Sequence, residues 1–147
     1  MTSLYVWLKF FHVLGVGAFL MGHGVSAGTS FALRGRPLDA MSRTLLQLSI
    51  RAQLVAWSAL GLIIVTGVWM GFVGSWWRTG WIWTAIAVFV AVLIVMSALS
   101  VPYHQARALK EDAVADSPLA RSRPMALLLT GVVALIALFF LMVVKPF

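Results

Sequence analysis

The sequence has no cysteine and very few charged side chains. Lys, Arg, Asp and Glu together make up 10% of the 147 residues, and only four of them are acidic. The absence of cysteine excludes disulfides, thiolate metal ligands and thiol catalysis. Soluble proteins carry roughly 25% charged and roughly 45–50% apolar residues, whereas this chain is 62% hydrophobic. So few polar groups cannot cover a soluble domain, which excludes a soluble enzyme and a disordered tail.

Four long apolar runs account for most of the chain. Each reaches or exceeds the roughly 20 residues that a helix needs to cross about 30 Å of hydrocarbon, and none alternates as barrel strands do. We therefore predict an all-α protein whose residues 1–147 form one four-transmembrane-helix bundle in a lipid bilayer. Val25-Ser26-Ala27 matches a signal-peptidase site, but we interpret it as part of the first span. The predicted helices cover residues 4–33, 52–73, 81–103 and 125–144.

The distribution of basic residues predicts the orientation of the bundle. Eight Lys and Arg residues belong to the first and third connections, and three lie on the other side. Basic connections stay in the cytoplasm, so we expect both termini outside the cytoplasmic (inner) membrane. This placement explains the net charge of +7, and we expect no nucleic-acid partner. Tryptophans around the short outer connection are typical of an interfacial anchoring belt: Trp69, Trp76, Trp77, Trp81 and Trp83.

The two cytoplasmic connections carry patterns of their own. Pro37 suits the first turn of a helix, and apolar residues then recur at spacings of three and four. This pattern predicts an amphipathic segment before the second helix, lying at the inner interface: Leu38, Met41, Leu45 and Leu48. After His104 we expect a short helical extension with three acidic residues among its bases, broken at Ser117-Pro118: Glu111, Asp112 and Asp116.

Small residues recur every four positions along the first run, in two rows. Close backbone approach through small residues drives helix association in lipid. One interpretation is therefore tight packing within the bundle or against a membrane-protein partner. The other is that the glycines leave room for a flat cofactor beside the helix. The first row is Ala18, Gly22, Ser26 and Ser30, and the second is Gly24, Gly28 and Ala32.

Three histidines are the main functional candidates. An ionisable residue within a span is costly and therefore a functional candidate. His12 and His23 are eleven residues apart, so they share one helix face but lie roughly 16 Å apart along the axis. Each needs partners from other helices. If the first helix leaves the hydrocarbon near Ser26, His23 lies level with His104 and the two form a haem clamp; if it continues to Arg34, that pairing fails.

Soft donors are predicted near His12 in the outer leaflet, namely Met70 and Met142. A histidine with two thioethers suits Cu(I), and a His/Met pair suits a haem iron. Each histidine also has a plain structural alternative: a hydrogen bond to a neighbouring helix, or headgroup contact for His104. No carboxylate lies inside a span, and neither a phosphate-binding glycine loop nor an HExxH motif is present. The sequence therefore does not indicate hydrolytic catalysis.

Three segments resemble a family of small bacterial four-helix membrane proteins of unknown function: LKFFHVLG at 8–15, VTGVW at 65–69 and LMVVKP at 141–146. This likeness covers nearly the whole chain, and its motifs are short and mostly apolar. The family is distantly similar to the membrane part of the copper-resistance protein CopD and to the protoporphyrinogen oxidase HemJ. In HemJ proteins a histidine three positions after a lysine is associated with haem, and Lys9 and His12 match this pair. The resemblance thus implies a haem- or copper-related protein with His12 as a ligand.

These observations lead to three functional hypotheses. The first is a membrane protein that binds haem b within the bundle and has a redox or haem-handling role, with axial ligands from His12, His23 and His104. The second is a copper-binding or copper-transport protein similar to CopD that uses His12, Met70 and Met142. The third is a non-catalytic accessory subunit of a respiratory or photosynthetic membrane complex, docked through Ala18, Gly22, Ser26 and Ser30.

Overall fold

The protein is a bundle of four long α-helices. The computed structural model describes residues 2–109 and 118–146, and these parts contain no strand. Each long helix is long and apolar enough to cross a membrane, which confirms the predicted all-α, four-span fold. The helices are α1 (Thr2–Ala32), α2 (Ala40–Val73), α3 (Gly80–Ala108) and α4 (Pro124–Val144), and two short 3₁₀ turns are η1 (Trp76–Arg78) and η2 (Pro118–Arg121).

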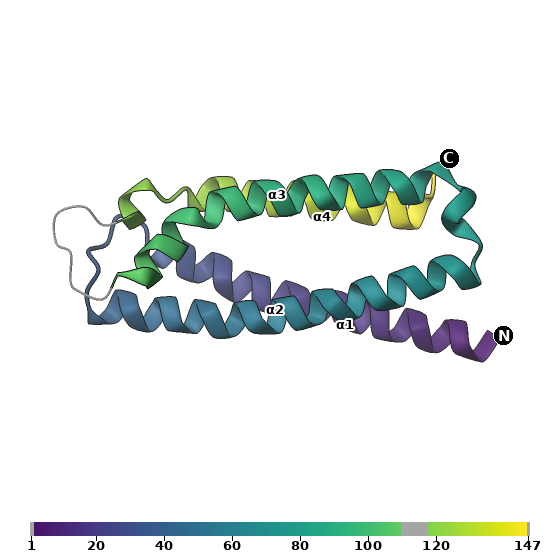
Figure 1. The fold of residues 1–147 in the computed structure, drawn as a ribbon, viewed down its shortest axis with the longest axis horizontal. Helices are drawn as coiled ribbons and strands as arrows, with labels where there is room; N and C mark the ends of the chain where they lie inside the picture. Colours follow the sequence, from purple (N-terminus) through teal and green to yellow (C-terminus); the bar gives the residue numbers. More distant parts are fainter. Residues whose placement is uncertain (1, 110–117, 147) are drawn as a thin grey trace.

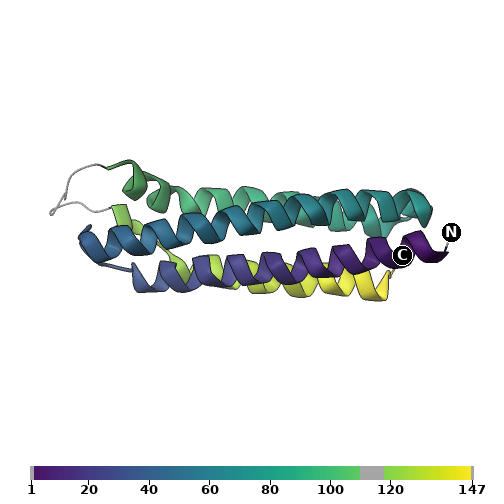
Figure 2. The same ribbon diagram turned by 90° about the horizontal axis from the view of Figure 1, so that it is seen from below.

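The helices pair into two hairpins, α1 with α2 and α3 with α4 (Figure 1). The hairpins meet along α1–α4 and α2–α3, and among these four helices no diagonal contact is made. Figures 1 and 2 place both termini at one end of the bundle. We call this the tryptophan end, because it also holds η1. The opposite end is called the arginine end, after its described arginines: Arg34, Arg36, Arg43, Arg51, Arg107, Arg121 and Arg123.

Helix α2 begins twelve residues earlier than the apolar run predicts, at Ala40 rather than residue 52. Its N-cap is Asp39, whose carboxylate accepts a hydrogen bond of 2.7 Å from the backbone N–H of Ser42. That hydrogen bond lowers the pKa of the Asp39 carboxyl below its ordinary value. Pro37 therefore precedes the helix instead of starting it, and its carbonyl accepts from the Ser42 hydroxyl at 2.8 Å. The predicted amphipathic segment is thus the first part of one continuous helix.

A compact apolar core closes the arginine end. The chain enters α2 through a turn at Gly35, whose φ of +67° favours glycine. The first turns of α2 bury Ser42, Leu46 and Ser49, whereas Met41 and Leu48 from the predicted apolar face are exposed. The interior of the bundle therefore selects a face that mixes small polar and apolar side chains. The buried core residues are Leu33, Leu38, Leu46, Tyr103, Ala106 and Leu119.

Helix α3 runs past its predicted end at residue 103 and finishes at Ala108. Pro102 lies inside it, where its ring removes one helical hydrogen bond and favours a bend. The last turns of α3 incline toward α2 in Figure 1. The extension after His104 is thus helical for one further turn. The predicted acidic cluster and break, Glu111, Asp112, Asp116 and Ser117, lie outside the described residues.

Aromatic rings cover the tryptophan end. The Trp76 ring contacts Trp81 at 5.4 Å and Tyr5 at 6.1 Å between centroids. The Lys145 ammonium lies over Trp76 at 4.3 Å and over Trp81 at 5.4 Å. Cation–π contacts of this kind link the end of α4 to the turn between α2 and α3. Trp81 is buried, whereas Trp69 and Trp83 are more than half exposed, as interfacial anchors are.

Candidate functional site

His12 lies in the contact between α1 and α2. Its Nδ1 is 3.0 Å from the Thr66 hydroxyl oxygen, and that hydroxyl donates its own proton to the Leu62 carbonyl at 2.6 Å. Because a hydroxyl has a single proton, Nδ1 of His12 must be the donor, which leaves the lone pair of the neutral ring on Nε2. The ring lies against Gly67, where a Cβ would be 3.2 Å from His12 Cε1. This histidine is buried and hydrogen-bonded.

His23 faces the other hairpin. It is half-buried, and its ring is stacked on Phe19 one turn away, with centroids 5.6 Å apart and an angle of 11° between the planes. Its Nε2 lies 3.3 Å from the position that a Cβ on Gly131 of α4 would occupy. Among the described residues, no hydrogen-bond partner reaches its ring. Phe19 thus orients an imidazole toward α4 that has no polar partner in the described chain.

Met96 of α3 meets His23 at the same glycine. Its Cε also lies 3.3 Å from the Cβ position of Gly131. The imidazole of His23 from α1 and the methyl end of the Met96 thioether from α3 therefore both reach a backbone position of α4 that carries no side chain. Imidazole and thioether are a donor pair used for haem iron and for Cu(I). We call His23, Met96 and Gly131 the seam site.

His104 lies away from the seam site. It is exposed near the end of α3, with Nδ1 3.5 Å from Nη1 of Arg107. Eight residues separate it from Met96, which is about 12 Å along a helix axis. Since Met96 and His23 both reach Gly131, His104 lies well outside the level of His23. α1 runs on to Ala32, the case in which the pairing of His23 with His104 was expected to fail.

The predicted copper ligands lie on three different helices, with His12 on α1. Met70 is buried on α2, whereas Met142 is 40% exposed on α4, and these two helices make no contact within the described bundle. Groups of three or more His, Asp and Glu side chains placed to hold a metal ion are likewise not found in residues 2–109 and 118–146.

The first row of small residues on α1 is used within the chain. A Cβ on Gly22 would lie 2.7 Å from the Ala52 carbonyl oxygen and 3.0 Å from the Ala56 nitrogen. Ser26 Oγ is 3.2 Å from Ser49 Oγ of α2, and Ser30 is buried. This face packs on α2, so it is not available to a membrane-protein partner as predicted. Gly24 and Gly28 of the second row have open space in place of a side chain.

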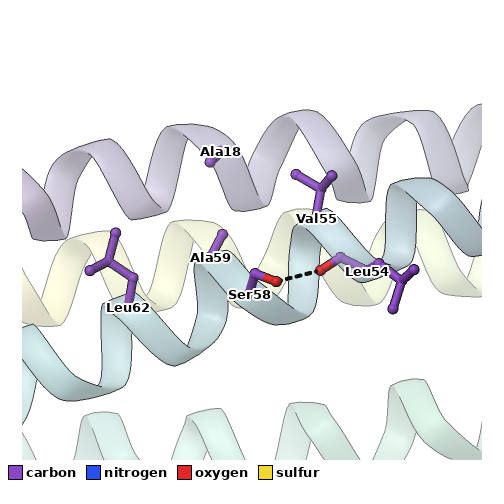
Figure 3. Close-up of a pocket in the computed structure, with 6 residues that line it drawn as sticks. All are labelled: Ala18, Leu54, Val55, Ser58, Ala59 and Leu62. Carbon is purple, nitrogen blue, oxygen red and sulfur yellow. Dashed lines mark hydrogen bonds between the residues drawn. The ribbon is translucent and has the colours of Figure 1, made fainter.

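A shallow apolar groove runs along the contact between α1 and α2 (Figure 3). Ser58 is its one polar lining side chain, and its hydroxyl donates to the Leu54 carbonyl at 3.0 Å. The groove therefore offers apolar contact and no free donor or acceptor side chain. Its lining residues are Ala18, Leu54, Val55, Ser58, Ala59 and Leu62.

Two residues of functional interest were not selected from the sequence. Met96 was not distinguished from the other methionines, because hydropathy does not reveal which helix faces which. Arg107 was counted as a flanking charge, yet it is half-buried and hydrogen-bonded to α2. One signal was available for Arg107: it lies four residues after Tyr103, on the face of α3 that this aromatic residue shares.

Comparison with known proteins supplies a family without a described activity. Residues 6–146 match the family described as "Predicted integral membrane protein (DUF2269)", so the chain belongs to this family. No curated protein matches the chain, and no solved structure does.

Proposed function

We propose that this DUF2269 protein binds haem b between its two helical hairpins and acts in electron transfer or haem handling. The observation that carries the proposal is the convergence of His23 and Met96, from different hairpins, beside Gly131. A His/Met ligand pair is an established way to hold haem iron, which would supply one-electron chemistry. The distant resemblance to HemJ and CopD that the sequence motifs suggest would agree with this assignment.

The residues around the seam site fit such a group chemically. The His23 ring is held by Phe19 and not by a hydrogen bond, so its Nε2 can donate to a metal without losing a protein partner. Because Gly131 has no side chain, His23 Nε2 and Met96 Cε can both approach the α4 backbone closely. The small-residue contact between α1 and α2 is separate from this site, so α1 and α2 can stay packed while a planar ligand enters between the hairpins.

His23 is a better candidate ligand than His12. The resemblance to HemJ implies His12, and the Nδ1–H tautomer there leaves a lone pair on Nε2. However, His12 is 9% exposed and its ring is closed in by Gly67 and Thr66 of α2. We therefore assign His12 a structural role, with Nδ1 holding α1 to α2, and His104 a position at the membrane interface.

The haem proposal is tested by spectroscopy of the purified full chain. We expect haem-loaded protein to show a Soret band and a reduced-minus-oxidised difference spectrum. The variants His23→Ala and Met96→Leu should each lower haem affinity by about tenfold or more, while His12→Ala, the matched imidazole deletion on the same helix, should retain the spectrum. A wild-type protein without a Soret band would overturn haem binding. A loss confined to His12→Ala would move the ligand to that residue.

Copper is the second candidate at the same site. An imidazole and a thioether side chain both reach Gly131, and a Cu(I) ion needs no separation of the hairpins. Titration with Cu(I) against a competing chelator should then show tight binding that falls in Met96→Leu and not in Met142→Leu. Binding of Cu(I) together with the absence of any haem spectrum would favour this candidate over the first.

We also propose that the arginine end faces the cytoplasm across the inner membrane. The seven described arginines at this end, against Lys9, Arg78 and Lys145 toward the other end, follow the positive-inside rule. Since the chain has no cysteine, single cysteines introduced at Arg36 and at Thr79 give an unambiguous test. A membrane-impermeant maleimide applied to intact cells should label the second position and not the first; the reverse pattern would overturn the orientation.

A further inference from the structure

Arg107 is a charged side chain without an acidic partner among the described residues; its contacts are Gln53, Ser49 and, at 3.5 Å, Nδ1 of His104. It lies in the last turns of α3, and its guanidinium donates from Nη1 to the Gln53 side-chain oxygen at 3.2 Å and from Nη2 to Ser49 Oγ at 2.9 Å. Ser49 in turn contacts Ser26 of α1 at 3.2 Å. One arginine therefore connects three helices at the arginine end through neutral groups.

Two donors on this face of α3 are buried without a hydrogen-bond partner in the described part of the chain. They are Nε of Arg107 and the hydroxyl of Tyr103, one helical turn earlier. Buried donors are normally satisfied, so a pair of them one turn apart indicates an acceptor that residues 2–109 and 118–146 do not provide. Asp39 is the only acidic residue described, and its carboxylate caps α2 through Ser42.

The energetics favour an anion at this position. A guanidinium held in a low-dielectric site is costly unless its charge is compensated. The neutral side-chain oxygens of Gln53 and Ser49 accept hydrogen bonds from the guanidinium but do not neutralise its positive charge. Seven described arginines and one aspartate at this end add a positive potential that attracts anions from the surrounding leaflet. The half-buried side chain still has an accessible part.

We propose that Arg107, positioned by Ser49 and Gln53, binds the phosphate group of an anionic phospholipid at the α2–α3 contact. The guanidinium fork suits phosphate oxygens geometrically, and a span that ends at the interface places Arg107 at headgroup depth. The bend associated with Pro102 inclines this part of α3 toward α2. A bound lipid would therefore link the two hairpins at one end. This inference is independent of the haem proposal.

The test uses the full-length, haem-free protein in detergent, so that a porphyrin carboxylate cannot act as the anion. Thermal unfolding and native mass spectrometry are measured with added phosphatidylglycerol, with phosphatidylcholine, and with inorganic phosphate. We expect phosphatidylglycerol to raise the melting temperature and to be retained in the mass spectrum. Arg107→Gln should reduce its affinity by about tenfold or more, because charge-assisted hydrogen bonds are lost.

Arg51→Gln is the matched control, since Arg51 is an exposed arginine at the same end; it should keep the response to phosphatidylglycerol. Arg107→Lys keeps the positive charge but lacks the planar guanidinium, so its stabilisation by phosphatidylglycerol should be intermediate. This variant replaces Arg107→Gln in the test if Arg107→Gln does not fold. Equal responses of the Arg107 variants and Arg51→Gln would overturn the site. A stabilisation by inorganic phosphate equal to that by phosphatidylglycerol would overturn the assignment to a lipid.

Discussion

Helix α1 makes two contacts of very different character. Toward α2 it presents glycine, serine and a hydrogen-bonded histidine, and at Gly22 the backbones approach so closely that a Cβ would meet a carbonyl oxygen at 2.7 Å. Toward α4 it presents His23, which stacks on Phe19 and reaches Gly131. In the contact with α2, the polar side chains of α1 are hydrogen-bonded. In the contact with α4, the imidazole of His23 has no hydrogen-bond partner among the described residues.

The difference shows how similar residues on one helix take different roles. Both His12 and His23 are imidazoles that face helix contacts, and both lie beside a glycine of the neighbouring helix. Thr66 makes His12 part of the scaffold, because its hydroxyl fixes the tautomer and accepts the proton. His23 has no such hydroxyl among the described residues, and the side chain that reaches the same glycine is a thioether, a much weaker acceptor. The residue opposite a histidine therefore indicates its role better than its depth does.

The largest effect is expected from closing the space at Gly22. In Gly22→Ala the new Cβ meets backbone atoms of Ala52 and Ala56, which cannot move as side chains do, so α1 and α2 must separate. We expect a loss of about 3 kcal/mol, the upper part of the range for overpacking, measured by unfolding in mixed micelles with SDS. Gly24→Ala, where a Cβ meets nothing within 4 Å, is the control and should cost nothing. Equal losses of stability in Gly22→Ala and Gly24→Ala would show that Gly22 does not lie in a tight contact with α2.

Filling the seam site should affect ligand binding more than folding. Gly131→Leu places a branched side chain where His23 Nε2 and Met96 Cε converge, and we expect haem affinity to fall about tenfold or more. Gly28→Leu adds the same side chain in open space on α1 and should leave affinity unchanged. Affinity is read from Soret titrations of both variants. An unaltered titration in Gly131→Leu would place the ligand elsewhere.

A smaller effect is expected from removing the hydroxyl opposite His12. Thr66→Val keeps the shape of the side chain but leaves Nδ1–H of His12 without its acceptor, at a cost of about 1 kcal/mol for an interhelical hydrogen bond in a membrane protein. Thr66→Ser restores the hydroxyl and should restore stability in the same unfolding assay. Haem affinity should not change in either variant. A parallel loss of haem in Thr66→Val would instead make Thr66 the orienting partner of a ligating His12.

The smallest effect concerns the start of α2, the helix that makes the tight contact. The Ser42 N–H lowers the pKa of Asp39 in the folded protein, so this cap stabilises the fold above the unfolded carboxyl pKa of about 3.9. Its contribution is lost as the pH falls through the lowered folded value. Melting temperatures between about pH 3 and pH 6 should therefore decline slightly more in the wild type than in Asp39→Asn, which caps without titrating. Identical slopes would contradict the capping role.

The number and approximate positions of the spans could be predicted from hydropathy, but some helix ends could not. Arg43 and Arg51 end the apolar run on the N-terminal side of α2 without ending the helix, because Asp39 caps it and no glycine or proline lies between residues 40 and 52. The third predicted span stops at residue 103, yet α3 passes through Pro102 and continues to Ala108. Hydropathy indicates where a chain leaves the hydrocarbon core of the membrane, and a helix can continue beyond that point.

The candidate site was less predictable than the fold. The histidines were identified as costly groups, and the small-residue row on α1 was correctly interpreted as a packing face. Met96 was missed because an apolar helix offers no polar face that would show which side meets its neighbours. The first turns of α2 gave a misleading pattern for a related reason: Ser42 and Ser49 are buried with Leu46, so small size, not apolarity, selects the inner face.

The position of Lys145 gives the molecule an intrinsic optical reporter. Its ammonium lies over two indole rings that also contact each other, and coupled indoles produce characteristic near-ultraviolet circular dichroism. Detachment of the C-terminal helix would remove the ammonium from both rings and change this signal, while the backbone signal of the helices persists. The docking of the last helix during membrane insertion can therefore be followed with no added chromophore.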